Sequence, residues 1–77
     1  MPKEEQQAKI RKRMRVIRAE QEWSNSDLAN ILGVKHISAK NKMNGYANWT
    51  LDDVMIISEV TGYSLDYVCG KTEAKNF

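Results

Sequence analysis

Residues 24–45 read SNSDLANILGVKHISAKNKMNG, and this stretch predicts two short helices joined by a tight turn. Ser24 and Asp27 fit a capping box, in which a serine side chain caps a helix and an acid three residues later reaches back to it. The helix that follows carries one apolar stripe, and Gly33, which accepts the positive φ common after a helix, ends it. A second helix is expected over residues 36–44.

The second of these helices is unusually polar. Ala39 and Met43, four residues apart, form its thin inner seam, and Gly45 ends it. Its opposite face carries Ile37, Lys40, Asn41 and Asn44. Such a helix gains little stability from burial, so we expect its outer face to contact another molecule. The small Ala29 is expected where the two helices cross, with Val34 beneath the turn.

Three further helices are expected around this pair. The first runs from about residue 5 to residue 22, and its apolar residues recur at the spacing of one helical face, namely Ile10, Met14 and Ile17. A second capping box, at Thr50 and Asp53, opens a fourth helix that Gly62 ends. Ser64 caps a short fifth helix, with Gly70 as its stop.

The apolar residues of the last two helices are expected to face the core. In the fourth helix these are Leu51, Val54 and Ile57, together with Ser58 and Thr61; in the fifth they are Leu65, Val68 and Cys69. Trp23 and Trp49 flank the central pair and are interpreted as core anchors in preference to platforms for stacked bases. No alternating stretch predicts a strand, so the fold class is all-α.

The 77 residues allow one compact domain with a modest core, which we place at about residues 8–70 with frayed ends. One cysteine and one histidine exclude an internal disulfide and a Cys/His zinc site, so no metal or cofactor is expected. The polar N-terminus and the lack of a long apolar run predict neither a signal peptide nor a membrane span. The expected location is the cytoplasm.

The charge is distributed unevenly along the chain. Residues 1–46 hold ten Lys/Arg against five Asp/Glu, a local charge of +5, whereas residues 47–77 hold two against five, a local charge of −3. Between Lys9 and Arg18 lie six positive residues and no negative one. A basic side of this kind suits a polyanion such as DNA. A solvated helix face would account for the same pattern.

Residues 24–45, 49–54 (WTLDDV) and 62–68 (GYSLDYV) resemble the phage repressor and Cro family of helix-turn-helix regulators. The resemblance spans roughly residues 10–70. It implies a compact five-helix, lambda-repressor-like domain in which helices two and three form the helix-turn-helix. In such a unit the second helix enters the major groove of DNA.

The resemblance also implicates particular side chains. Base contacts are expected from Lys35, His36, Ile37 and Asn41, and phosphate contacts from Asn25, Ser38 and Asn44. Side-chain chemistry adds Lys40 and Lys42 as phosphate contacts. Asn41 suits bidentate contact with adenine, and Ile37 could pack only against a thymine methyl group. A plain surface position explains either residue as well, and a structural role explains His36.

Three positions depart from the family pattern. Lys42 stands where many members have a large apolar residue, and Lys35 offers no side-chain cap to the third helix. Some members pair an arginine at the position of Arg18 with an acid late in helix three. That position is Met43 here, so the pair is absent.

We therefore expect a sequence-specific regulator of transcription, Cro-like or a minimal repressor, that binds double-stranded DNA. Two copies should bind a near-palindromic site, as a homodimer at least on DNA, because one short helix reads too few base pairs. The expected contact surface is the fifth helix and the tail, through Tyr63, Tyr67 and Phe77. The alternative is a protein-interaction module such as an antitoxin of the same fold. An enzyme is not expected, because no catalytic constellation is present.

Overall fold

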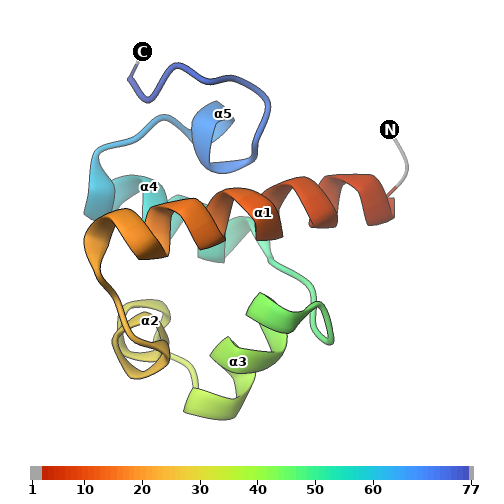
Figure 1. The fold of residues 1–77 in the computed structure, drawn as a ribbon, viewed down its shortest axis with the longest axis vertical. Coiled ribbons are helices and arrows are strands. Elements are labelled where there is room, and N and C mark those ends of the chain that lie inside the picture. Colours follow the sequence, from red (N-terminus) through yellow and green to blue (C-terminus); the bar gives the residue numbers. More distant parts are fainter. Residues whose placement is uncertain (1–2, 77) are drawn as a thin grey trace.

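The computed structural model describes residues 3–76, which form five α-helices and no strand (Figure 1). The helices are α1 (Lys3–Gln21), α2 (Asn25–Leu32), α3 (His36–Asn44), α4 (Leu51–Thr61) and α5 (Leu65–Val68). The long α1 crosses the middle of the molecule, with α2 and α3 on one side and α5 with the C-terminal segment on the other. The predicted all-α fold of five helices is confirmed.

The helix ends follow the local signals in the sequence. Ser24 Oγ accepts from the backbone N–H of Asp27 at 3.0 Å, and the Asp27 carboxylate accepts from the N–H of Ser24 at 2.9 Å. The box at Thr50 has the same two bonds. Gly33 takes the left-handed conformation, with φ of 69°, which ends α2 as expected. Helix α1 ends one residue earlier than expected because Glu22 itself adopts a positive φ of 57°.

One core joins all five helices. Its largest fully buried side chains are Met14, Ile17, Leu28, Ile57 and Val68. Ala29 and Ala39 are buried in the same core, as the predicted close approach of α2 and α3 requires. Trp49 is buried and Trp23 is half-buried against the core. Ser58, Thr61 and Cys69 are half-buried, and burial raises the pKa of the Cys69 thiol.

Two leucines were wrongly expected in the core. Leu51 is 69% exposed and Leu65 is 39% exposed. Each is the first residue of its helix, directly after the N-cap. In α4 the buried face is centred on Asp53, Val54 and Ile57, which leaves Leu51 at its edge.

The C-terminal segment lies against α1 and α5. The N–H of Ser64 donates to the carbonyl of Lys75 at 2.6 Å, and Arg13 donates to the carbonyl of Thr72 and to the carboxylate of Glu73. The Arg13 guanidinium also covers the ring of Tyr67, 3.9 Å from its centroid. Residues 71–76, expected to be frayed, are thus held by specific contacts.

These contacts correct the expected dimer surface. Tyr67 is only 4% exposed and Tyr63 is half-buried, with its ring edge-on to Tyr67 at 5.1 Å. Phe77 lies outside the described residues. No helix within residues 3–76 combines the length and the apolar character needed to cross a membrane.

Candidate nucleic-acid interface

Helix α3 presents its predicted outer face to solvent. Ile37 is 56% exposed. The other candidates are exposed at Lys35, His36, Lys40 and Asn44 and half-buried at Ser38 and Asn41. Lys35 is the N-cap residue and makes no side-chain capping bond, as expected. Seven candidates are therefore at least partly accessible to solvent, and α3 contains no acidic residue.

Lys42 lies elsewhere, and its expected placement on the DNA-facing side is corrected. It is 9% exposed, and its ammonium group is ion-paired with the buried carboxylate of Asp53. It also donates to the carbonyl of Asn48 at 3.4 Å. Lys42 lies one helical turn after the buried Ala39 and next to the buried Met43, so it belongs to the inner face of α3. Its charge is already neutralised within the protein.

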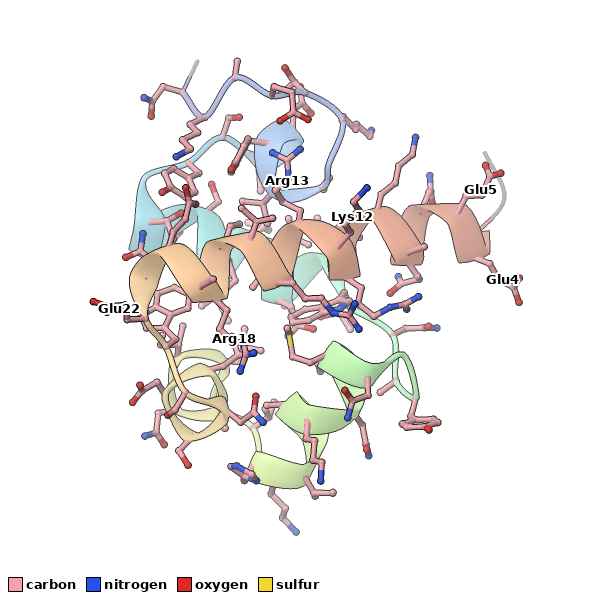
Figure 2. All side chains as sticks on the ribbon, in the orientation of Figure 1. Glu4, Glu5, Lys12, Arg13, Arg18 and Glu22 are labelled. Carbon is pink, nitrogen blue, oxygen red and sulfur yellow. The ribbon has the colours of Figure 1, made fainter. Side chains whose placement is uncertain are left out.

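Asn25 occupies the first turn of α2 and is held there by α1. The Arg18 guanidinium donates from Nη1 to Asn25 Oδ1 at 3.1 Å, and Figure 2 shows Arg18 on the α2 side of α1. The bond leaves the Nδ2 group of Asn25 as the donor that can serve an incoming ligand. Arg18 thereby has a partner, the amide of Asn25, in place of the acid that some repressor-family members carry late in helix three.

Sequence reasoning missed an arginine row on α1, which we define as Arg11, Arg15 and Arg18. Arg15 Nη2 approaches the carbonyl of Met43 at 3.5 Å. The guanidinium of Arg11 lies against Gly45, where an added Cβ would be 3.1 Å from Nη1. The spacing i, i+4, i+7 was a usable signal, because it repeats the core stripe of α1 one residue later.

The other positive residues of the stretch from Lys9 to Arg18 face the opposite way. Figure 2 shows Lys12 and Arg13 on the α5 side of the helix, where they line a hollow with Tyr67 and Glu73. Lys9 borders the same hollow. The six-residue basic stretch is therefore divided: three arginines border the helix-turn-helix, and three residues border the C-terminal segment.

The family model of the BetR domain matches residues 3–77. The chain belongs to the BetR domain family. This family is a small domain of helix-turn-helix type, which identifies the chain as a DNA-binding regulatory domain. Comparison with curated proteins and with solved structures finds no significant match.

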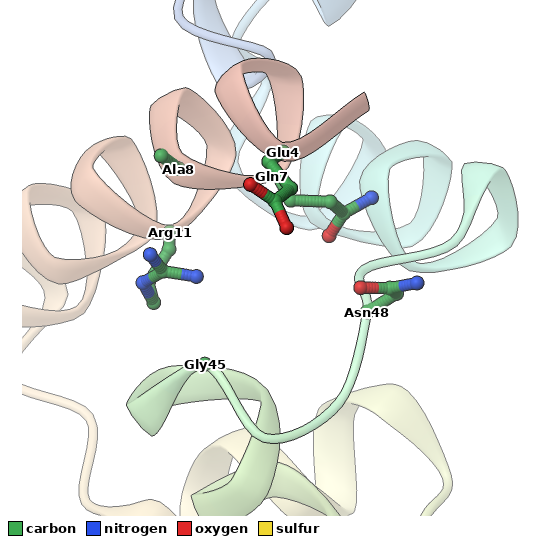
Figure 3. A pocket seen from close by; sticks show the side chains of 6 residues that line it. All are labelled: Glu4, Gln7, Ala8, Arg11, Gly45 and Asn48. Carbon is green, nitrogen blue, oxygen red and sulfur yellow. The ribbon is translucent and has the colours of Figure 1, made fainter. Parts of the chain in front are cut away.

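Two hollows in this BetR domain lie beside the arginine row. The first, of about 580 Å³, opens between the start of α1 and the loop after α3 (Figure 3). It is lined by Glu4, Gln7, Ala8, Arg11, Gly45 and Asn48. Gln7 also fixes this loop, since its amide accepts from the N–H of Trp49 and donates to the Trp49 carbonyl. A carboxylate and a guanidinium share this hollow, so its charge is mixed.

The second hollow, which we call the arginine hollow, lies between α1, α2 and α3 and measures about 360 Å³. It is lined by Arg15, Arg18, Asn25, Lys40, Met43 and Asn44. The structure thus brings two predicted phosphate contacts of α3, Lys40 and Asn44, together with Asn25 and two arginines of α1. Among the described residues, its lining includes three cations and no carboxylate.

Proposed function

We propose that this BetR domain is a sequence-specific regulator of transcription, Cro-like or a minimal repressor, that inserts α3 into the major groove of DNA. The observation that carries the proposal is the outer face of α3. It is accessible, rich in hydrogen-bond donors and free of acidic residues, and a capped α2 and the core hold the helix rigidly from behind. Ile37, 56% exposed on this face, is the apolar side chain available to a thymine methyl group.

The candidate side chains divide into those that read bases and those that hold phosphates. Asn41 can donate to and accept from adenine at once, and Ile37 can pack on a thymine methyl group. Lys35 and His36 lie at the start of α3, the end that commonly meets base edges in this kind of unit. The residues suited to phosphate are Asn25, Ser38, Lys40 and Asn44.

Two copies on a near-palindromic site are the proposed assembly. Half-sites about one helical turn apart, roughly 34 Å, would suit two recognition helices in successive major grooves. Tyr67 is unavailable for such a contact because Arg13 covers it. Apolar side chains that are exposed near the end of α4 and at the start of α5 are instead Val60 and Leu65. This proposal includes no catalytic activity. It places the protein in the cytoplasm, where it would meet DNA.

The test is selection of bound duplexes from a random pool, followed by titration of the selected duplex and a scrambled duplex of equal length. We expect enrichment of one sequence repeated in inverted orientation, with stronger binding to the selected duplex. Enrichment of a lone half-site, protected by a single protein at saturation, would contradict the two-copy assembly. If no duplex were enriched or bound, the DNA proposal would fail, and the protein-interaction alternative would replace it.

A further inference from the structure

The arginine hollow concentrates positive charge without a counter-anion among the residues that line it. Arg15 is exposed, and the only hydrogen bond of its side chain within the described residues is a long one of 3.5 Å to the carbonyl of Met43. Arg18 donates one hydrogen bond to the side-chain amide of Asn25, which is neutral. Lys40, from α3, is exposed and enters no ion pair in the described residues. Three like charges from two helices therefore converge.

Like charges that share a hollow repel one another, and a bound anion would remove this cost. The amides of Asn25 and Asn44 line the same hollow and supply neutral N–H donors. Guanidinium groups match the oxygens of a phosphate geometrically, often through two parallel bonds. The donors thus favour a phosphate group over a single-atom anion.

The neighbouring basic features of α1 differ in this respect. Arg11 shares its hollow with Glu4, and Arg13 is ion-paired with Glu73 at 3.0 Å. Their charges have anionic neighbours within the chain, whereas those of the arginine hollow have none among its lining residues. The hollow also adjoins the outer face of α3 through Lys40 and Asn44, so a ligand of α3 would pass directly beside it.

We propose that the arginine hollow binds one backbone phosphate of the DNA whose major groove α3 enters, with Arg15 as its principal cation. This inference rests on the proposed function. It extends the protein's contact with DNA from the helix-turn-helix to α1. The phosphate is held by Arg15 and Lys40 from opposite walls, while Arg18 orients the Asn25 amide toward it.

The test compares Arg15→Gln with Lys12→Gln. Both substitutions remove one charge from an exposed position of α1, but Lys12 lies on the flank that faces α5. We expect Arg15→Gln to weaken binding about tenfold at low salt, on selected and scrambled duplexes alike, and to reduce the slope of log K against log salt by about 0.9. Lys12→Gln should leave both quantities nearly unchanged. Thermal unfolding should be the same for both variants and the parent.

A second measurement locates the phosphate. Duplexes that carry a neutral methylphosphonate at one position each are titrated with the parent protein and with Arg15→Gln. We expect one position per half-site at which neutralisation weakens the parent about tenfold and leaves the variant almost unaffected, the non-additivity expected of contacting groups. If losses at every position were additive with the substitution, the hollow would contact no phosphate.

The outcomes separate this inference from the function on which it rests. If the parent binds a selected duplex but Arg15→Gln and Lys12→Gln weaken it equally, the hollow is not a phosphate site and the proposed function stands. If the parent binds no duplex, the proposed function itself fails. The phosphate group could also come from free inorganic phosphate, which NMR titration without DNA tests. Saturation of the Arg15 side chain at micromolar phosphate would assign the hollow to a free anion and overturn the DNA contact.

Discussion

The outer and inner faces of α3 each carry a lysine, and the two lysines differ in exposure and in their partners. Lys40 and Lys42 are two residues apart, carry the same charge and were both expected to contact phosphate. Lys40 lies exposed beside the arginine hollow, whereas Lys42 is buried and ion-paired with Asp53. The charge of Lys40 remains available to a ligand, and the charge of Lys42 joins α3 to the core.

The inner face of α3 is joined to α4 by the ion pair between Lys42 and Asp53. Asp53 is the acid of the capping box of α4, and its Oδ2 accepts from both the N–H of Thr50 and the ammonium of Lys42. In the equivalent box of α2, the carboxylate of Asp27 is exposed and binds only Ser24 among the described residues. The capping box of α2 therefore acts only within its own helix, whereas the capping box of α4 also binds a residue of α3. Four predictions test this contrast between the faces.

The largest effect is expected where the inner side of the helix pair is overfilled. Ala29→Glu would force a charge into the buried layer between α2 and α3, at a cost above about 4 kcal/mol. Because a domain of this size is stable by only about 5–10 kcal/mol, the substitution should remove a large share of the free energy of unfolding and lower the urea midpoint steeply. Urea unfolding followed by circular dichroism measures this. The control is Asn30→Glu, at an exposed neighbouring position, and an unchanged midpoint for Ala29→Glu would show that the crossing is not tightly packed.

The next effect separates the two lysines directly. Lys42→Met should destabilise the domain by about 3–5 kcal/mol, because it leaves the buried Asp53 carboxylate without its ionic partner. Lys40→Met, the same change on the outer face, should alter the free energy of unfolding by less than about 0.5 kcal/mol. Denaturant titration of both variants measures this difference. Equal stability of the two would mean that the Lys42–Asp53 pair contributes nothing in solution.

The third prediction concerns reading by the outer face. Asn41→Ala should cost roughly 1–3 kcal/mol on the selected duplex and little on scrambled DNA, because it removes a base contact and no phosphate contact. The backbone carbonyl of Asn41, which accepts from Tyr46 and Ala47, is retained in this variant. Titration on both duplexes gives the specificity ratio. An equal loss on both would remove α3 from the role of reading helix.

The smallest effect concerns holding by the outer face. Lys40→Met should weaken binding to every duplex by a similar, modest factor and lower the salt slope by about 0.9. The readout is the slope measured at several salt concentrations on selected and scrambled DNA. Asn41→Ala serves as the matched comparison, since it should leave the slope unchanged. A loss confined to the selected duplex would mean that Lys40 reads sequence.

The sequence alone determined the features that depend on neighbouring residues. The bounds of α2 and α3 follow from Ser24, Gly33 and Gly45, whose effects act within one helical turn. The exposure of Ile37 and Lys40 follows from helical periodicity, because the inner seam at Ala39 leaves them on the other side. These expectations needed no knowledge of distant parts of the chain, which is why they could be made from one sequence.

The tertiary structure decided where each charge acts. Lys42 is neutralised by an acid 11 residues later, and Arg13 is covered by a segment about 60 residues away, so neither outcome is visible in local spacing. The division of the basic residues of α1 into two flanks likewise depended on which elements pack on either side of that helix. A charge has the same chemistry at every position, but its partner and its desolvation depend on the whole fold, and these determine whether it stabilises the protein or remains free to bind DNA.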